Sequence, residues 1–159
     1  MEIRQIKRTD NKTVATLIKS VFEEYNAPKE GTVYSDAATN SLYECFRIEN
    51  AELWVAEDEG KIVGCCGVYP TEGLPEGCAE LVKFYIGKEA RGKGLGKKLM
   101  EASLASALQF GYRELYLESL PEFSNAVSWY KKLGFKSLDE RLGNSGHSSC
   151  NIWMLKTLV

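Results

Sequence analysis

Glycines at alternate positions stand among basic residues where a helix is predicted to begin. Gly92, Gly94 and Gly96 lie in the run Arg-Gly-Lys-Gly-Leu-Gly-Lys-Lys, residues 91–98. The first N–H groups of a helix have no partner within the helix, and the helix dipole places partial positive charge where they point. Glycines let an anion approach these N–H groups, and the neighbouring Arg and Lys side chains add positive charge. The sequence therefore predicts a turn that binds a phosphate or a pyrophosphate.

A strand is predicted before this turn and a helix after it. The apolar, β-branched or aromatic residues of the strand are Leu81, Val82, Phe84, Tyr85 and Ile86. The helix has apolar or small residues at helical spacing, namely Leu95, Leu99, Ala102, Ser106 and Phe110. A plain tight turn is the weaker interpretation, because alternating glycines destabilise a helix start unless a ligand approaches the backbone.

Two other phosphate-binding patterns fail at single positions. A nucleotide-binding P-loop needs Ser or Thr to hold magnesium where this chain has Gly94. The dinucleotide-binding fingerprint needs Gly or Ala where this chain has Leu99. A P-loop-like nucleotide binder therefore stays only as a disfavoured alternative.

The composition predicts a single domain over residues 1–159, with 44% hydrophobic and 26% charged residues. A net charge of −2 argues against general binding to nucleic acid or to an anionic membrane. The 5 cysteines are odd in number and contain no Cys-x-x-Cys pair, which disfavours a zinc site or a disulfide framework. With no apolar leader and no run of transmembrane length, we expect a cytoplasmic protein without a metal.

The hydrophobic patterns predict the element order β-α-α-β-β-β-α-β-α-β-β. Six of the seven strands are expected at about residues 2–7, 53–56, 62–69, 80–86, 115–118 and 149–157. Helices are expected from a cap at Thr9-Asp10 to about Asn26, from Ala38 to Phe46 or Ile48, and over residues 95–110 and 124–132. A helix joins strand 80–86 to strand 115–118, so these two strands are expected to run parallel.

The glycine turn resembles the Arg/Gln-x-x-Gly-x-Gly/Ala signature of the GNAT superfamily of acetyl-CoA-dependent N-acetyltransferases. A second stretch, residues 126–135 (Ala-Val-Ser-Trp-Tyr-Lys-Lys-Leu-Gly-Phe), is similar to a later motif of that superfamily, Ala-x-x-x-Tyr-x-x-x-Gly-Phe. The two motifs occur in the proper order, and the expected elements follow the superfamily pattern along nearly the whole chain. The resemblance implies a mixed α/β fold, an α+β sandwich. Its central sheet is mostly antiparallel, with one parallel, splayed strand pair and helices on both faces.

The resemblance also implies acetyl-CoA as co-substrate, with its pyrophosphate at the turn and its pantetheine arm between the splayed strands. The residues implied in coenzyme binding are Phe84, Tyr85, Ile86, Arg91, Gly92, Lys93, Gly94, Leu95, Gly96 and Lys97. A backbone N–H near Ile86 would polarise the thioester carbonyl. The chain departs from the family at Phe123, where many members have an Asn that binds the pantetheine arm. Asn125 is close but two positions out of register.

Tyr130 and Glu80 are the catalytic residues that the resemblance implies. Tyr130 matches a tyrosine that acts as general acid in many relatives, and a phenol can donate a proton to a leaving thiolate. Its alternative is a packing role between helix and sheet. Glu80 aligns with a glutamate that deprotonates the amine in some relatives. The alternative is that Glu80 is a solvated carboxylate at the end of a strand, without a catalytic role. Glu118 is the second candidate for the base.

The expected function is transfer of an acetyl group from acetyl-CoA to a primary amine, by direct attack in a ternary complex. A non-catalytic acetyl-CoA sensor of the same fold is the alternative. The acceptor, a small molecule or a peptide or protein amine, is left open, as is a homodimer. Carboxylates around the expected acceptor side give weak support for a cationic amine, and they are Glu23, Glu24, Glu72, Glu76 and Glu80. The only histidine, His147, lacks a nucleophile motif and is expected in a loop or a substrate contact.

Overall fold

The computed structural model describes residues 1–159, which build one seven-stranded sheet in the order β1-β2-β3-β4-β5-β7-β6. The strands are β1 Glu2–Gln5, β2 Glu52–Asp58, β3 Lys61–Tyr69, β4 Cys78–Ile86, β5 Glu114–Ser119, β6 Lys136–Ser137 and β7 Ile152–Thr157. Every neighbouring pair is antiparallel except β4 and β5, which are parallel. The predicted mixed α/β fold and the element order are confirmed.

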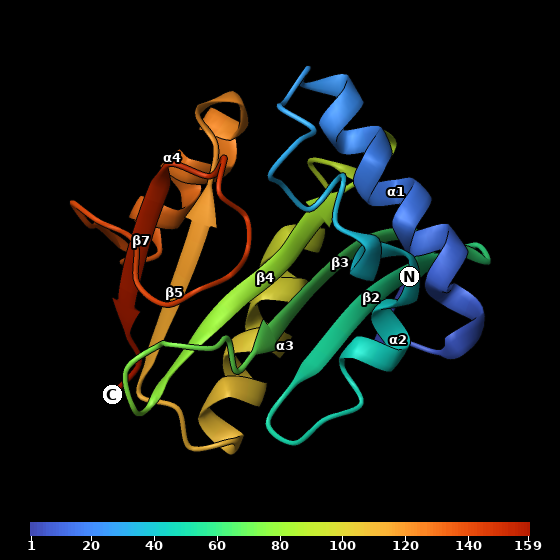
Figure 1. Cartoon of the computed structure of the whole chain (residues 1–159). Coiled ribbons are helices and arrows are strands. Elements are labelled where there is room, and N and C mark those ends of the chain that lie inside the picture. The colour runs from blue at the N-terminus through green and yellow to red at the C-terminus, as the bar shows by residue number, and fades with distance from the viewer.

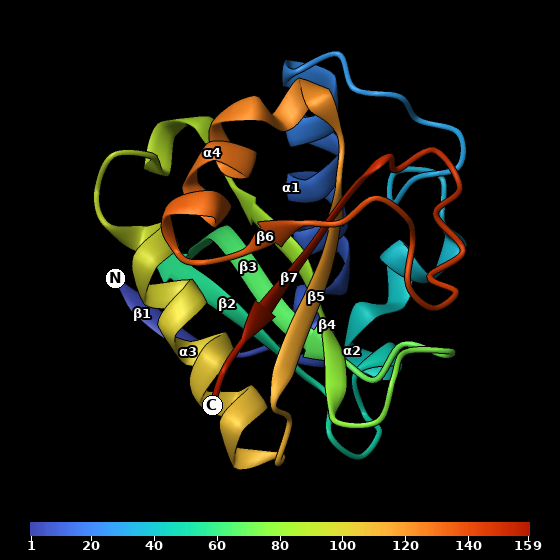
Figure 2. The same cartoon turned by 90° about the vertical axis from the view of Figure 1, so that its left-hand side faces the viewer.

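Helices cover both faces of the sheet, as Figures 1 and 2 show. They are α1 Asn11–Glu24, α2 Leu42–Cys45, α3 Leu95–Gln109 and α4 Ser124–Lys132. Apolar residues of α1 and α2 pack on one face and form one buried cluster, and those of α3 and α4 form a second cluster on the other face. No helix has both the length and the apolar character that a membrane crossing requires.

The strands β4 and β5 diverge along their length (Figure 1). They pair only from Cys78 with Glu114 to Glu80 with Tyr116. Beyond this point β4 carries an irregularity, because the register with β3 shifts between Cys65 and Gly67. A bulge of this kind bends a strand and increases its twist. The predicted splayed parallel pair is therefore present.

The region predicted as a second long helix is shorter and less regular. Residues Ala37–Ser41 form a 3₁₀ turn, which the Asp36 carboxylate caps by accepting from Ala38 N–H at 3.0 Å. Ser41 has a φ of −140°, outside the helical region, so α2 starts anew at Leu42. Ile48 is 47% exposed rather than part of an apolar face. Periodicity alone overestimated this helix, because the side chain of Asp36 stabilises a tighter turn.

The predicted cap of α1 also differs from the structure. The carboxylate of Asp10 accepts from Lys7 N–H at 2.7 Å and from Arg4 at 2.8 Å, and it makes no cap bond to α1. Arg4 lies on β1, and this pairing fixes the strand to the turn that precedes α1. The pKa of Asp10 is lowered by these bonds despite its burial.

Candidate active site

The glycine turn adopts a backbone that only glycine enters readily. Gly92 and Gly94 both have a φ of +77°, and a Cβ at either position would meet nothing within 4 Å. Glycine is therefore needed at these two positions for its backbone conformation and not for lack of room, because the space in front of them is open. Gly96 differs, since a Cβ there would lie 3.0 Å from Ile86 Cδ1. This glycine allows α3 to pack closely against β4.

The turn presents a continuous row of free backbone donors. The N–H groups of residues 91–97 have no acceptor in the protein, and the first backbone bond of α3 runs from Lys98 N–H to Gly94 O at 3.3 Å. Unpaired N–H groups at a helix start, with the positive end of the helix dipole, attract an anion. None of the protein's own carboxylates fills this position.

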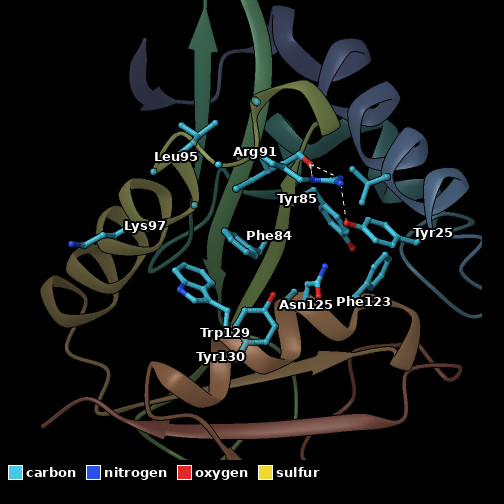
Figure 3. Close-up of a pocket in the computed structure, with 17 residues that line it drawn as sticks. Tyr25, Phe84, Tyr85, Arg91, Leu95, Lys97, Phe123, Asn125, Trp129 and Tyr130 are labelled. Atoms are coloured by element: carbon cyan, nitrogen blue, oxygen red, sulfur yellow. Dashed lines mark hydrogen bonds between the residues drawn. The ribbon is translucent and has the colours of Figure 1, made fainter.

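A cavity of about 490 Å³ lies directly beside these donors (Figure 3). The expected coenzyme-binding residues that line it are Phe84, Tyr85, Ile86, Arg91, Gly92, Gly94, Leu95, Gly96 and Lys97. Lys93 is not among the lining residues. The Lys97 side chain points away from the cavity, and its ammonium lies 4.0 Å from Glu101. The backbone groups of the turn therefore face the cavity more directly than the lysine side chains of the turn do.

Arg91 is bound within the protein, a contact that the sequence did not indicate. Its guanidinium donates to both carboxylate oxygens of Glu24 on α1, each at 2.7 Å. It also donates to Ile86 O at 3.1 and 2.9 Å and to the Tyr25 hydroxyl at 2.9 Å. The Glu24 carboxylate raises the pKa of Arg91, so the charge is fixed. Arg91 thus joins α1 to the end of β4 and leaves the anion to the backbone.

The end of β4 directs backbone groups into the gap beside β5. Gly87 N–H donates to Val63 O at 2.8 Å, so these residues form a hydrogen-bonded pair. Bonded and non-bonded pairs alternate along antiparallel strands. Ile86, opposite Gly64, therefore turns its N–H and C=O away from β3. Arg91 binds the C=O, and the N–H faces the gap.

Tyr130 projects from α4 toward the same cavity (Figure 3). It is 6% exposed, with Phe84 at 6.0 Å and Phe135 at 5.8 Å between ring centroids. Its hydroxyl makes no hydrogen bond within the protein, and it is not among the fully enclosed polar atoms that lack a partner. Burial raises the pKa of Tyr130 well above its usual value, so the phenol keeps its proton.

A second cavity of about 60 Å³ meets the first across the gap. Both are lined by Phe84, Tyr85, Phe123 and Tyr130. The charged or titratable residues of the smaller cavity also include Glu80, Lys83, Glu118 and His147. The Tyr130 ring therefore stands where two chambers join.

Glu80 lies inside the smaller cavity and not at a solvated strand end. It is 5% exposed, and the Thr71 hydroxyl donates to Oε1 at 2.6 Å. Burial raises the pKa of Glu80 to about 7, and the nearby negative charge of Glu118 adds to this effect. A carboxylate with such a pKa can exchange a proton near neutral pH.

Glu118 is held by partners on every side. Its side chain is 2% exposed and accepts hydrogen bonds from Tyr116, Arg141 and Ser145. The Arg141 guanidinium lies 3.3 Å from Oε1. A carboxylate committed in this way is a weaker candidate base than Glu80.

The structure also places the remaining residues that the sequence singled out. Phe123 packs edge-on against Phe22 with centroids 5.2 Å apart, so the wall is aromatic at this position. Asn125 lines the larger cavity. His147 lies in a loop, with Nε2 at 2.9 Å from Asp36 Oδ2. Of the five carboxylates noted on the acceptor side, only Glu80 lines either cavity.

Sequence patterns missed other residues of the site. Trp129 has a helical spacing typical of core residues, yet it lines the larger cavity and stacks on Phe84 at 5.4 Å. Tyr25, at the end of α1, lines the same cavity. Lys83 reaches the smaller cavity through the bulge of β4. No local pattern marks these three, because each depends on contacts distant in the sequence.

This fold, with a row of free N–H groups beside a splayed strand pair, defines a class of coenzyme-dependent acyl-transfer enzymes. The model of the Acetyltransferase (GNAT) family matches residues 18–135, and the chain belongs to this family. The predicted family and enzyme class, N-acetyltransferase, are thereby confirmed.

Relatives and solved structures agree with this assignment. The chain is 34% identical to the Uncharacterized N-acetyltransferase YjgM of Escherichia coli K12, over 98% of the chain and 94% of that protein. It is 32% identical to human N-acetyltransferase 8B over 77% of the chain, and it spans 50% of that protein's length. A GNAT-family acetyltransferase from Staphylococcus aureus Mu50 superposes with a TM-score of 0.83 at 18% identity, covering 99% of both chains. The PaiA N-acetyltransferase from Thermoplasma acidophilum, solved with coenzyme A, has a TM-score of 0.75 at 22% identity, covering 98% of both.

Proposed function

We propose that the protein transfers an acetyl group from acetyl-CoA to the primary amine of an acceptor, by direct attack within a ternary complex. The observation that carries this proposal is the meeting of two cavities at the Tyr130 ring. One cavity has the anion-binding turn at its edge, and the other contains the buried carboxylate of Glu80. Such an arrangement can hold two substrates at once and bring their reactive ends together.

The larger cavity fits the coenzyme. The free N–H groups of residues 91–97 suit a diphosphate, which needs several donors. The open space in front of Gly92 and Gly94 leaves room for it. The gap beside Phe84, Tyr85 and Ile86 would take the extended pantetheine arm, with strand-like bonds to backbone groups that β3 does not use. The coenzyme A complex of the PaiA enzyme, a protein of the same fold, is consistent with this use.

The proposed chemistry divides three tasks among residues of this chain. Glu80 accepts a proton from the acceptor ammonium, so that a neutral amine attacks. The Ile86 N–H donates to the thioester oxygen, where negative charge develops. Tyr130 gives its proton to the leaving thiolate, and its raised pKa keeps that proton in place until it is needed. The second proton that the attacking nitrogen loses as the amide forms restores the phenol.

The alternatives are less well supported. A coenzyme sensor would need only the turn, so it does not account for a buried carboxyl with a pKa of about 7 in a cavity that Tyr130 also lines. A nucleotide binder would need a magnesium ligand in the turn, and Gly94 has no side chain to supply one.

The acceptor class is named for some proteins of this fold, but these names belong to those proteins. One is an aminoglycoside 6'-acetyltransferase and another is a ribosomal-protein-alanine N-acetyltransferase. For this chain the acceptor would enter the smaller cavity.

Parallel titrations of the purified protein with acetyl-CoA and with ATP test the proposal. Acetyl-CoA binding without ATP binding, together with thiol release when amines are added, is the expected result. ATP binding without coenzyme binding would contradict it. Coenzyme binding without thiol release for any amine would instead support the sensor.

A further inference from the structure

Lys83 has a backbone conformation that a lysine rarely adopts. It lies within the bulge of β4 with a φ of +56°. Residues with a side chain pay about 1–2 kcal/mol in this left-handed region, and such strain tends to persist where function requires it. No glycine or asparagine, which would relieve the strain, stands at this position.

The bulge also decides which way Lys83 faces. Residues alternate between the two faces of a strand, so Lys83 would lie opposite to Glu80, three positions earlier. The extra residue of the bulge breaks this alternation. Among charged groups, Glu80 and Asp36 act most strongly on the Lys83 ammonium, and Lys83 in turn acts on His147. Glu80 and Lys83 therefore line the same small cavity.

The other charged groups at this cavity already have partners. His147 pairs with Asp36 at 2.9 Å. Glu118 pairs with Arg141 at 3.3 Å. Lys83 makes no ion pair and no side-chain hydrogen bond, and Glu80 receives a bond only from the neutral Thr71. One carboxyl group and one lysine amine are thus left without an oppositely charged partner, and they form no ion pair with each other.

We propose that Lys83 binds a carboxylate of the acceptor, so that the enzyme acts on amines of the α-amino-acid type. Glu80 and Lys83 then match the two ends of a zwitterion, one receiving the ammonium group and the other the carboxylate. The inference rests on the proposed acetyl transfer and adds the acceptor class. A polycationic acceptor would place a second positive charge near Lys83, at a cost in a cavity with little water.

The solvation of Lys83 agrees with this assignment. Burial lowers the pKa of the Lys83 ammonium, because a charge without a counter-ion is poorly stabilised away from water. A bound carboxylate would supply the missing counter-charge and reverse this effect. The same pairing would fix the acceptor amine at a set distance from Glu80.

The test compares amino acids with their own carboxamides in the full-length enzyme. Thiol release from acetyl-CoA is followed with glycine, L-leucine, L-phenylalanine and β-alanine, with each matching carboxamide, and with spermidine. The amine of a carboxamide is less basic than the amine of the matching acid, so at a given pH more of it is in the neutral form that attacks. Protonation alone would therefore favour the carboxamide, and a preference for the acid must come from the protein. We expect the best acid to exceed its carboxamide by about 30-fold or more in kcat/KM, as for a hydrogen bond between charged groups.

Variants assign this preference to Lys83. Lys83→Met should lower kcat/KM for the acid to about the level of the carboxamide, so that the ratio between the two falls to near one, and Lys83→Arg should restore part of that ratio. Lys61→Met, at an exposed lysine of β3, is the matched control and should keep the full preference. Unchanged coenzyme affinity in Lys83→Met would show that the variant is folded.

The outcomes separate this inference from the proposed function. Equal turnover of acids and carboxamides, or a preference for spermidine, would overturn the inference and leave acetyl transfer intact. If no amine is turned over, calorimetry measures whether the same acids bind to the complex of the protein with coenzyme A. Binding of an acid that Lys83→Met abolishes supports the carboxylate site, and no binding of any acid overturns it.

Discussion

At the scale of single residues, the hydroxyl of Tyr130 lines the cavity and makes no hydrogen bond within the protein. Its removal should therefore cost little stability and act almost entirely on the reaction. We expect Tyr130→Phe to lower kcat by about 10²-fold, within the range of general acid catalysis. The KM for acetyl-CoA and the unfolding temperature should stay close to those of the wild type. Steady-state kinetics and thermal unfolding check both points, and an unchanged kcat would reduce Tyr130 to a packing residue.

Glu80 should control how activity depends on pH. As a base it must be ionised, so kcat/KM should rise with pH through about 7, the pKa of the buried carboxyl. Glu80→Gln should remove this limb and lower the plateau by about 10²-fold. The pH–rate profiles of the two proteins provide the measurement. Glu118→Gln is the comparison, and a limb lost there but kept in Glu80→Gln would reverse the assignment.

The same carboxyl should affect stability with a definite sign. Its pKa rises from 4.5 in the unfolded chain to about 7 in the folded protein, so the folded state holds this proton more tightly. Ionisation between these values destabilises the fold, by on the order of 3 kcal/mol once pH exceeds about 7. Glu80→Gln should therefore gain stability relative to the wild type at pH 8 and not at pH 4. Denaturant unfolding at both values tests this, with the exposed Glu76→Gln as control.

Residues of the site were predictable from sequence only where a local pattern marks them. The glycine turn and Tyr130 lie in short motifs with fixed spacing, and both reach the cavity. The partners of Arg91 and the direction of Lys83 were not predictable in this way. Arg91 meets Glu24, which lies 67 positions earlier, and Lys83 lines the same cavity as Glu80 at a bulge in β4. Contacts of this kind depend on the tertiary fold, and a single sequence does not contain them as a pattern.

At the scale of elements, the start of α3 and its end allow a matched comparison. Gly94 and Gly111 both have positive φ, +77° and +90°, and a Cβ at either would meet nothing within 4 Å. Alanine should therefore strain both by about 1–2 kcal/mol. Only Gly94 lies at the turn with free N–H groups, where a methyl group would intrude on the anion.

Gly94→Ala should thus weaken coenzyme A binding by about 10-fold or more, whereas Gly111→Ala should leave it unchanged at a similar loss of stability. Calorimetric titration and thermal unfolding of both variants give the two quantities. Equal affinities in the two variants would mean that the turn does not hold the coenzyme.

Most elements followed from periodicity, and the exceptions have local causes. The amphipathic spacing of α1 and α3 and the hairpin of β2 and β3 gave correct types and order. The region after Asp36 failed, since a side-chain cap and the extended φ of Ser41 interrupt the helix. Such competition between side chains and backbone does not alter the hydrophobic pattern.

At the scale of the whole molecule, the sheet consists of two parts that share only a short parallel contact. The pairing from Cys78 with Glu114 to Glu80 with Tyr116 is the one ladder between β1–β4 and β5–β7. The proposed coenzyme cavity has walls from both parts, because β4 and the glycine turn face α4 across it (Figures 1 and 3). A ligand in this gap should therefore act as a second connection between the two parts.

Coenzyme A should accordingly protect backbone amides far beyond those it touches. At a concentration of 100 times its Kd, it should stabilise the folded protein by about 2.7 kcal/mol. The added protection in hydrogen exchange should extend over α4 and β5, which open when the two parts separate, and should be small in α2, which lies on the opposite face of the sheet. Mass spectrometry of peptides covering residues 114–132 and 37–48 makes the comparison. Protection confined to residues 91–98 would mean that the coenzyme binds the turn without joining the two parts of the sheet.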